Sequence, residues 1–126
     1  MLSLLSRKPR LLLLDDDPSM QRLVTAMLKR EGYRIDVVAS GSQAIDKVQS
    51  TKYDALLLDV MTPTDGGMTV IRYLREASPA LLRRVVLVTA SPPSVLAAVE
   101  EEVFAIVHKP FEPKDLVATV AGALKP

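Results

Sequence analysis

The sequence contains no cysteine and only one histidine, His108. Without cysteine the chain can form neither a disulfide nor a thiolate metal site, and one histidine cannot build a histidine-rich metal centre. The net charge of +1 gives no bulk attraction to nucleic acid or to anionic lipid. We therefore expect no direct nucleic-acid binding and no membrane association, and the absence of cysteine is compatible with a location in the reducing cytoplasm.

Long apolar segments, repeats and low-complexity stretches are also missing. The apolar Met1–Ser6 is too short to span a membrane, and basic residues follow it, whereas in a signal peptide they would precede it. We expect residues 1–9 to form a flexible leader and residues 10–126 to form one domain. With 48% hydrophobic residues, a domain of this length can bury a single core.

The stretch DALLLDVMTPTDGG, residues 54–67, holds the most informative pattern. Four apolar residues, Ala55–Leu58, lead to Asp59 and are followed by turn-forming residues, which predicts a buried parallel strand with a carboxylate at its end. Ligands of open parallel sheets bind at the carboxyl ends of the strands. Asp59 is therefore a candidate functional residue, although on this stretch alone it could equally end a strand or cap the next turn.

Four further strand patterns alternate along the chain with five patterns of helical spacing. Gly32 and Pro79 are expected to stop the first and third helices, and Ser42 to cap the second. Alternating strands and helices predict a parallel sheet with helices on both faces. The other predicted strands are Arg10–Leu14, Tyr33–Val38, Val85–Val88 and Val103–Val107.

Four of the five predicted strands end in side chains that can take part in chemistry. The first ends at Asp15–Asp17, the third at Asp59, the fourth at Thr89 and the fifth at Lys109. Each has an ordinary explanation as a helix cap, a strand-end hydroxyl or a salt-bridge partner. In a doubly wound sheet, however, these strand ends converge on one crevice, which favours a shared site.

Asp15, Asp16 and Asp59 would repel one another at short range, so these carboxylates need a compensating cation. Magnesium takes oxygen ligands and keeps waters that a phosphate can replace. Lys109 supplies a mobile positive charge, and Thr89 supplies a hydroxyl donor. A metal, an ammonium and a hydroxyl around one carboxylate can stabilise a phosphoryl group in transfer, so we expect Asp59 to be a nucleophile that forms an aspartyl phosphate.

This set of residues resembles the receiver domain of two-component response regulators, as in the chemotaxis regulators. The resemblance extends from about Arg10 to the end of the chain. It implies a flavodoxin-like doubly wound sheet of five parallel strands in the order 2-1-3-4-5, and a signalling switch rather than an enzyme. The matching residues, in order along the chain, are Asp15–Asp16, Asp59, Pro63, Gly67, Thr89–Ala90 and Lys109–Pro110–Phe111.

The resemblance also implies a donor, a metal and an output. Asp59 would accept its phosphoryl group from a sensor histidine kinase or a phosphotransfer protein. Mg²⁺ would be held by Asp16, Asp59 and the backbone carbonyl of Met61, with Asp15 assisting through water. The signal would then pass to a downstream output protein or act through self-association, since the chain shows no basic helix-turn-helix segment for direct DNA binding.

Thr89 and Lys109 are expected to contact the phosphoryl group, and the Lys109–Pro110 peptide bond is expected to be cis. Members of the family often carry an aromatic switch residue three positions before the lysine, but here that position is Ile106. The segment between Thr89 and Lys109 is short and contains Pro92–Pro93, which predicts a stunted or displaced helix.

Two positions bear on how long a phosphoryl group would last. Met61 and Ser91 stand two residues after Asp59 and Thr89, and neither can deprotonate an attacking water, so we expect slow autodephosphorylation.

Two alternatives stay open: a receiver used only for docking, and a haloacid-dehalogenase-like phosphatase. The phosphatase needs a second aspartate where Met61 stands. Thr62 also departs from the family, which usually has methionine before the loop proline.

Overall fold

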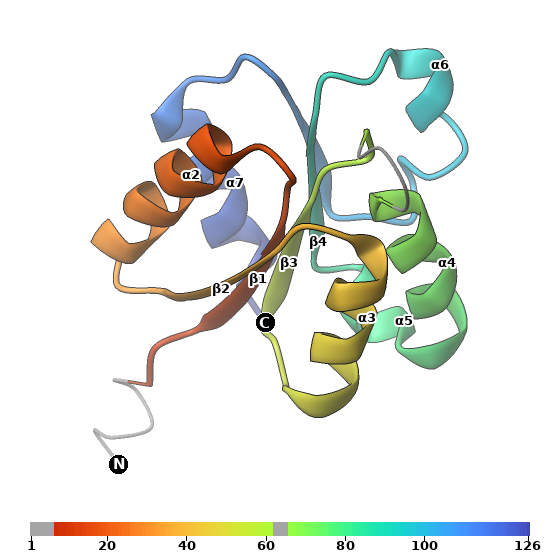
Figure 1. The fold of residues 1–126 in the computed structure, drawn as a ribbon, viewed down its shortest axis with the longest axis horizontal. Helices are drawn as coiled ribbons and strands as arrows, with labels where there is room; N and C mark the ends of the chain where they lie inside the picture. The colour runs from red at the N-terminus through yellow and green to blue at the C-terminus, as the bar shows by residue number, and fades with distance from the viewer. Residues whose placement is uncertain (1–6, 62–65) are drawn as a thin grey trace.

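Five short apolar stretches pair side by side as a parallel sheet in the computed structural model, which describes residues 7–61 and 66–126 (Figure 1). Their order across the sheet is β2-β1-β3-β4-β5, which confirms the predicted topology. The strands are β1 (Arg10–Leu14), β2 (Arg34–Val38), β3 (Ala55–Leu58), β4 (Val85–Thr89) and β5 (Ala105–His108).

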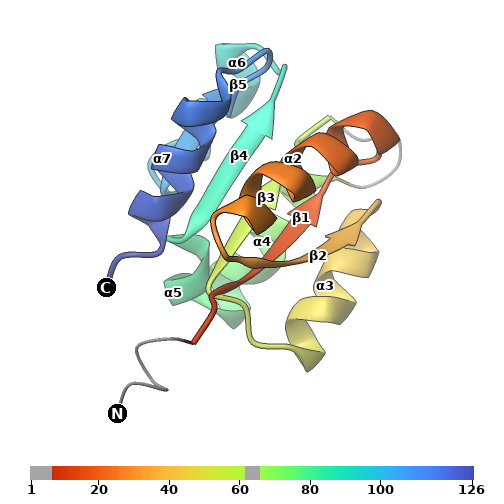
Figure 2. The same cartoon turned by 90° about the vertical axis from the view of Figure 1, so that its left-hand side faces the viewer.

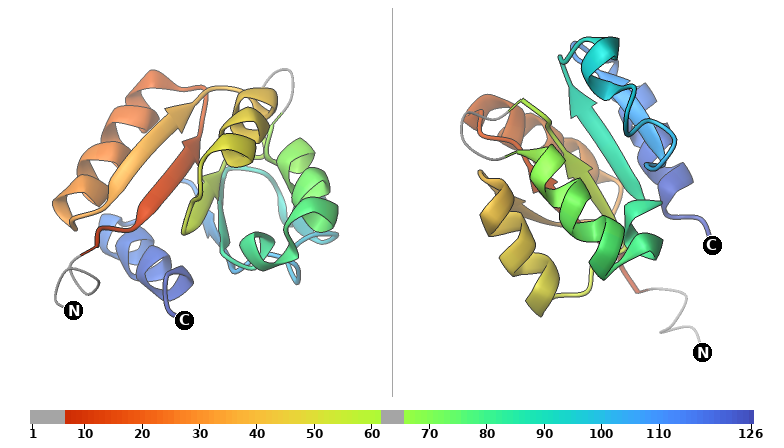
Figure 3. Two further views of the ribbon diagram at one scale, coloured as in Figure 1. Left: turned by 90° about the horizontal axis from the view of Figure 1, so that it is seen from below. Right: turned by 90° about the vertical axis from the view of Figure 1, so that its right-hand side faces the viewer.

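Helices cover both faces of the sheet, as Figure 3 shows from below. Apolar side chains of α2 and α7 pack on one face, and those of α3, α4, α5 and α6 pack on the other. The two hydrophobic clusters are separated by the sheet because successive strand residues point to opposite faces. The helices are α2 (Pro18–Arg30), α3 (Gly41–Ser50), α4 (Gly67–Ala77), α5 (Pro79–Leu82), α6 (Pro93–Leu96) and α7 (Pro113–Ala123).

The central strands are buried on both faces, which explains why their sequences are apolar without alternation. Every residue of β3 and β4 is buried, and in β1 only Arg10 is partly exposed. The edge strand β2 is more polar and more exposed. All five strands run in one direction, so their carboxyl ends form one end of the sheet and their amino ends form the other (Figure 2).

Of the expectations about helix boundaries, the cap at Ser42 was wrong and the stop at Pro79 is confirmed, since α4 ends at Ala77. Ser40, rather than Ser42, caps α3: its backbone is extended and its hydroxyl accepts a hydrogen bond from the Gln43 backbone N–H at 3.2 Å. Ser42 lies inside the first turn. Pro79 does more than end α4, because it also begins the short α5, where proline suits the first helical position.

The region after β4 also differs in detail from the prediction. The stunted helix expected there is confirmed, since α6 has four residues. The strand expected at Val103–Val107 runs instead over Ala105–His108. Val103 is buried in the core, but it precedes the strand. An apolar residue that packs beneath a turn has the same sequence signal as a buried strand residue.

Two predicted features lie outside the described residues. These are residues 1–6 of the leader expected over residues 1–9, and the part of the loop after β3 that holds Thr62 and Pro63. Across the ranges 7–61 and 66–126, the longest apolar helix is too short and too polar to cross a bilayer.

Candidate functional site

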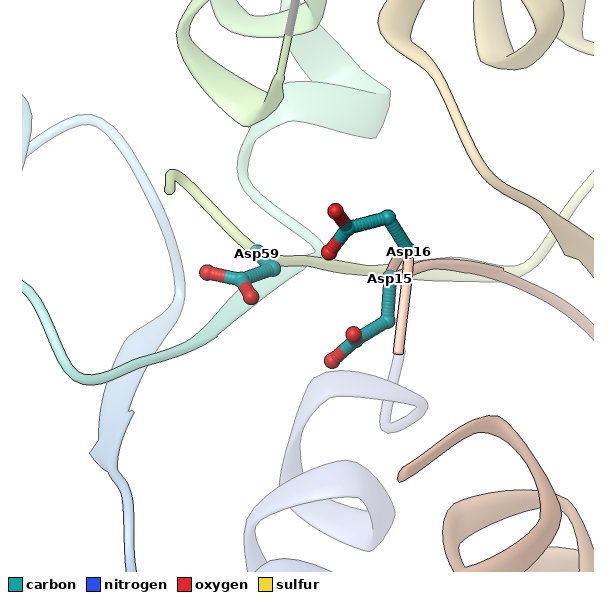
Figure 4. A group of neighbouring side chains, drawn as sticks. All are labelled: Asp15, Asp16 and Asp59. Atoms are coloured by element: carbon teal, nitrogen blue, oxygen red, sulfur yellow. The ribbon is translucent and has the colours of Figure 1, made fainter. Parts of the chain in front are cut away.

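Three carboxyl groups meet at the carboxyl end of the sheet (Figure 4). Asp15 and Asp16 follow β1, and Asp59 follows the neighbouring β3. One oxygen atom from each of the three side chains lies within 4.8 Å of the others. The structure therefore brings together three aspartates that the sequence placed at the ends of two different strands.

Asp15 is held in place by its own chain and is only 1% exposed. Its backbone N–H donates to the Val38 carbonyl at 3.2 Å, which extends the pairing of β1 with β2. Its Oδ1 accepts a hydrogen bond from the Asp17 backbone N–H at 2.9 Å. Asp16, in contrast, is exposed, so one of the three carboxylates faces solvent and can receive an incoming ligand.

Asp59 is 6% exposed, and hydrogen bonds hold both its backbone and its side chain. Its backbone N–H donates to the Leu14 carbonyl at 2.9 Å, and its Oδ1 accepts from the Met61 backbone N–H at 3.0 Å. Gly67 approaches so closely that a Cβ there would lie 2.9 Å from the Asp59 carbonyl oxygen. Asp59 thus both ends its strand and caps the following turn, and it also takes part in the cluster.

Lys109 bridges the two buried carboxylates. Its Nζ donates to Asp15 Oδ2 at 2.7 Å and to Asp59 Oδ2 at 3.0 Å. Burial alone would lower the pKa of the Lys109 ammonium, but its hydrogen bonds with the two aspartates raise that pKa above its ordinary value of 10.5. The Lys109–Pro110 peptide bond is cis, in agreement with the expectation.

Thr89 ends β4 at the same end of the sheet and is fully buried. Its hydroxyl donates to Ser91 Oγ at 3.0 Å and accepts from the Ser91 backbone N–H at 3.2 Å. Ser91 is itself only 2% exposed. The two hydroxyl groups therefore form a buried pair at the same end of the sheet as the carboxylates, and no periodic pattern in the sequence predicted this pair.

Two further residues after β1, Asp17 and Gln21, form hydrogen bonds near the carboxylate cluster. Asp17 caps α2, because its Oδ1 accepts from the Ser19 backbone N–H at 3.1 Å. The cap interpretation therefore holds for the third aspartate of the run. Gln21 donates its side-chain N–H to the Asp15 carbonyl. The sequence analysis did not identify Gln21. The pattern that could have indicated it is its position four residues after the cap residue Asp17.

Ile106, at the position where an aromatic switch is common, is partly buried and packs against the cluster under α3 and α4. Met61 is 61% exposed, so its side chain contributes little to the core. The role expected of its backbone carbonyl as a metal ligand stays a prediction. So do the phosphoryl contacts expected of Thr89 and Lys109.

The donor set at this site fits Mg²⁺. The cluster has three carboxylates and one ammonium, which contacts two of them, so negative charge is in excess, and all candidate side-chain ligands are hard oxygen atoms. The exposed Asp16 leaves room for water and for a phosphate. With Lys109 beside the same carboxylates, the arrangement can neutralise charge that develops on a transferring phosphoryl group.

Comparisons with known proteins agree with this geometry. The family model described as the response regulator receiver domain matches residues 11–121. The DNA-binding response regulator MtrA of Mycolicibacterium smegmatis is 38% identical over 120 residues, which cover 94% of this chain and 51% of MtrA. The chain thus spans about half the length of such relatives.

Solved structures share the fold over nearly their whole length. A sensor protein from Polaromonas sp. JS666 has a TM-score of 0.84 at 29% identity, covering 94% of this chain and 97% of its own. The receiver domain of a sensor histidine kinase from Pseudomonas aeruginosa PAO1 has a TM-score of 0.82 at 26% identity, with coverages of 94% and 98%. That receiver holds a magnesium ion coordinated in its active-site cleft.

Proposed function

Because the chain belongs to the response regulator receiver domain family, we propose that it is a phosphorylatable switch whose phosphoryl group is carried by Asp59. A carboxylate oxygen of Asp59 attacks phosphorus in a phosphohistidine or a small acyl phosphate. The bond between phosphorus and the donor breaks, and the donor leaves with the electron pair. The observation that carries this proposal is the convergence of Asp15, Asp16 and Asp59, two of which, Asp15 and Asp59, share the Lys109 ammonium.

The residues present also suggest which groups would supply positive charge during phosphoryl transfer. Asp16, Asp59 and the carbonyl of Met61 would hold Mg²⁺, with Asp15 assisting through water. When bound, Mg²⁺ supplies positive charge that stabilises the phosphoryl group in transit. Lys109 already donates to Asp59 Oδ2 and, still protonated, would move toward a phosphoryl oxygen once Asp59 carries the phosphoryl group as an acyl phosphate.

The proposed donor is a sensor histidine kinase or a phosphotransfer protein, and the proposed location is the cytoplasm. The output passes to a partner protein or to a second copy of the chain. MtrA is a DNA-binding response regulator. Its DNA binding is a property of the whole protein, and the match with this chain covers 51% of the length of MtrA.

Asp59→Asn is expected to abolish phosphorylation, because an amide cannot act as the nucleophile. The protein is incubated with acetyl phosphate and Mg²⁺, and the added phosphoryl group is measured by intact-mass spectrometry. Asp46→Asn, on an exposed position of α3, is the matched control and should be phosphorylated like the wild type. Undiminished phosphorylation of Asp59→Asn would reject the assignment, and an unmodified wild type would favour a docking module.

We further propose slow autodephosphorylation, because no side chain two residues after Asp59 or Thr89 can deprotonate water. The structure alters how this is tested. Ser91 is 2% exposed and bonded to Thr89, so a larger acid there would disturb buried neighbours, whereas Met61 is exposed. Met61→Asn should therefore shorten the lifetime of the acyl phosphate, because an amide can orient the attacking water. Decay is followed after donor removal with Mg²⁺ in excess, and equal decay rates would exclude control by this position.

A further inference from the structure

One hydroxyl group at the carboxyl end of the sheet forms its hydrogen bonds outside the carboxylate cluster. Thr89 Oγ1 donates to Ser91 Oγ at 3.0 Å and accepts from the Ser91 backbone N–H at 3.2 Å. Across the part of the chain that the structure describes, no hydrogen bond joins this hydroxyl to an aspartate or to the Lys109 ammonium. Because a hydroxyl has one proton to donate, that proton is committed to Ser91.

The backbone of Thr89 is fixed by the neighbouring strand. Its carbonyl accepts from the Lys109 backbone N–H at 2.9 Å, and Thr89 lies in register with His108 of β5. Every residue of β4 is buried, so a shift of the strand would also disturb the core. Rotation of the side chain between staggered positions moves the hydroxyl and leaves the backbone in place. The Thr89 hydroxyl can therefore reach another acceptor only by rotating away from Ser91.

Ser91 is held in place by the residues that follow it. Pro92 restricts the backbone of Ser91 to extended conformations, and Pro93 restricts Pro92 in the same way. Pro92 has φ −68° and ψ 155°, and Pro93 begins α6 beyond the carboxyl end of β4 (Figure 1). Leu96 then anchors α6, since it is 1% exposed and packs in the core. Ser91 Oγ is therefore a fixed acceptor that does not follow the Thr89 side chain.

Two acceptors would compete for the proton of the Thr89 hydroxyl. One is Ser91 Oγ, and the other is an oxygen of a phosphoryl group on Asp59, and a single proton serves only one of them at a time. Thr89 and Ser91 are 0% and 2% exposed, so water has little access to replace a bond that breaks. Donation to the phosphoryl group therefore leaves a buried serine oxygen without its donor, which costs free energy.

We propose that Ser91 is a positioning residue that holds the Thr89 hydroxyl away from the phosphoryl group on Asp59. This role rests on the proposed function, because only a phosphoryl group on Asp59 supplies the competing acceptor. Ser91 stabilises the resting arrangement of Thr89 and thereby lowers the affinity of the site for its phosphoryl group. It acts through the Thr89 hydroxyl and needs no contact of its own with the phosphoryl oxygens.

A purely structural role for the hydroxyl pair leads to a different expectation. Serine and threonine side chains often bond to the backbone two residues on, and the bond from the Ser91 N–H to Thr89 Oγ1 is of this kind. If the pair only stabilised this turn, loss of the Ser91 hydroxyl would lower stability and would not strengthen the binding of a phosphoryl group. The positioning role instead requires that the effect of Ser91 on binding depends on the Thr89 hydroxyl.

The test measures the affinity of the full chain for beryllium fluoride in the presence of Mg²⁺, a stable mimic of the acyl phosphate. Binding is followed by NMR titration with isotope-labelled threonine methyl groups. Ser91→Ala should tighten binding about fivefold, the factor that a typical single hydrogen bond contributes to an equilibrium. In a Thr89→Val background the same change should have no effect on affinity. Ser94→Ala removes an exposed hydroxyl from α6 and, as the matched control, should leave the affinity unaltered.

A second measurement does not need the phosphoryl mimic. Three-bond couplings of the Thr89 methyl carbon report the rotamer of this side chain. In the wild type without ligand one rotamer should be populated, whereas in Ser91→Ala the couplings should average over several. If Ser91→Ala does not fold, Ser91→Cys serves in its place. It keeps a side chain of similar size with only a weak sulfur acceptor, so it should change the affinity in the same direction.

Three results would overturn the positioning role of Ser91. They are unchanged or weaker binding in Ser91→Ala, an equal gain in the Thr89→Val background, and a single Thr89 rotamer with and without the Ser91 hydroxyl. These results leave the proposed function intact as long as the wild type is phosphorylated by acetyl phosphate. A wild type that is neither phosphorylated nor able to bind beryllium fluoride would instead reject the proposed function, and the role of Ser91 with it.

Discussion

The charged side chains at the two ends of the sheet differ in their burial and in their ion pairing. At the carboxyl end, Asp15 and Asp59 are 1% and 6% exposed, and both share the Lys109 ammonium. At the amino end, Lys29 and Arg34 are exposed and form no salt bridge within the described residues. Buried charges that share partners act as a unit, so the loss of one disturbs the others. Exposed charges act nearly independently, so their effects add.

This contrast follows from the parallel topology. Every strand contributes its last residue to one end of the sheet and its first residue to the other. Acidic residues follow β1 and β3, whereas basic residues begin β1 and β2 and precede β4. The net charge of +1 is a sum over the whole chain and conceals this separation.

The largest expected effect concerns Mg²⁺ at the carboxyl end. Asp16→Ala should weaken Mg²⁺ binding by roughly a hundredfold or more, because even outer partners of metal ligands contribute about 10–100-fold. Asp36→Ala removes a carboxylate at the amino end and should leave Mg²⁺ affinity unchanged. NMR shift titration measures both. If the two variants bind Mg²⁺ with equal affinity, the metal does not bind at the carboxylate cluster.

A second comparison concerns two glycines that lack space for a Cβ. At Gly67 the added Cβ would lie 2.9 Å from the Asp59 carbonyl oxygen and 3.2 Å from Leu58 Cβ, and this backbone cannot move without disturbing the site. Gly67→Ala should lower the free energy of unfolding by about 1–3 kcal/mol. At Gly122 the obstacle is the Phe104 ring at 2.9 Å, on a side chain that is 45% exposed.

Because the Phe104 ring can turn away and alanine favours a helix, Gly122→Ala should change the free energy of unfolding by less than about 1 kcal/mol. Urea denaturation of the two variants provides the measurement. Gly67→Ala should also weaken Mg²⁺ binding through displacement of Asp59, whereas Gly122→Ala should not. Equal stability of the two variants would mean that the backbone at Asp59 relaxes as easily as an exposed ring.

The sequence predicted the sheet because the evidence for it is local. Apolar runs such as Ala55–Leu58 and the glycine and proline stops between them specify the alternation of strands and helices. Parallel pairing then requires Asp15 and Asp59 to meet, because they follow neighbouring strands. The carboxylate cluster is therefore a consequence of topology, and a strand order is enough to predict it.

What the sequence did not predict depends on side chains that meet across the fold. The Thr89–Ser91 pair, the bond from Gln21 to the Asp15 carbonyl, and the ion pair of Arg75 with Glu102 leave no periodic signal. The cap at Ser40 was misplaced by two residues because two serines flank Gly41 and either could offer a hydroxyl. Only the backbone conformation distinguishes between them.

The smallest expected effect tests the amino end, where Tyr53 donates to Asp36 beside Arg10. Burial alone would raise the pKa of Asp36, but hydrogen bonds from Tyr53 and Arg10 lower it below its ordinary value of 3.8. Burial and the bond to Asp36 raise the pKa of Tyr53 from 10.0 to about 12. Tyr53→Phe should lower the free energy of unfolding by about 1 kcal/mol near neutral pH, since Arg10 still pairs with Asp36.

The pH dependence of that difference follows from the two shifts. A lowered carboxyl pKa stabilises the fold above pH 3.8, and this contribution is lost as pH falls through the lower pKa of the folded state. A raised tyrosine pKa stabilises the fold below pH 10.0, and this contribution is lost as pH rises to about 12. The difference between wild type and Tyr53→Phe should therefore be flat between these limits and shrink beyond each. Urea denaturation across this range measures it, with Tyr73→Phe as a control on α4. A difference that persists unchanged in acid would mean that Tyr53 stabilises the amino end by packing alone, independently of the charge on Asp36.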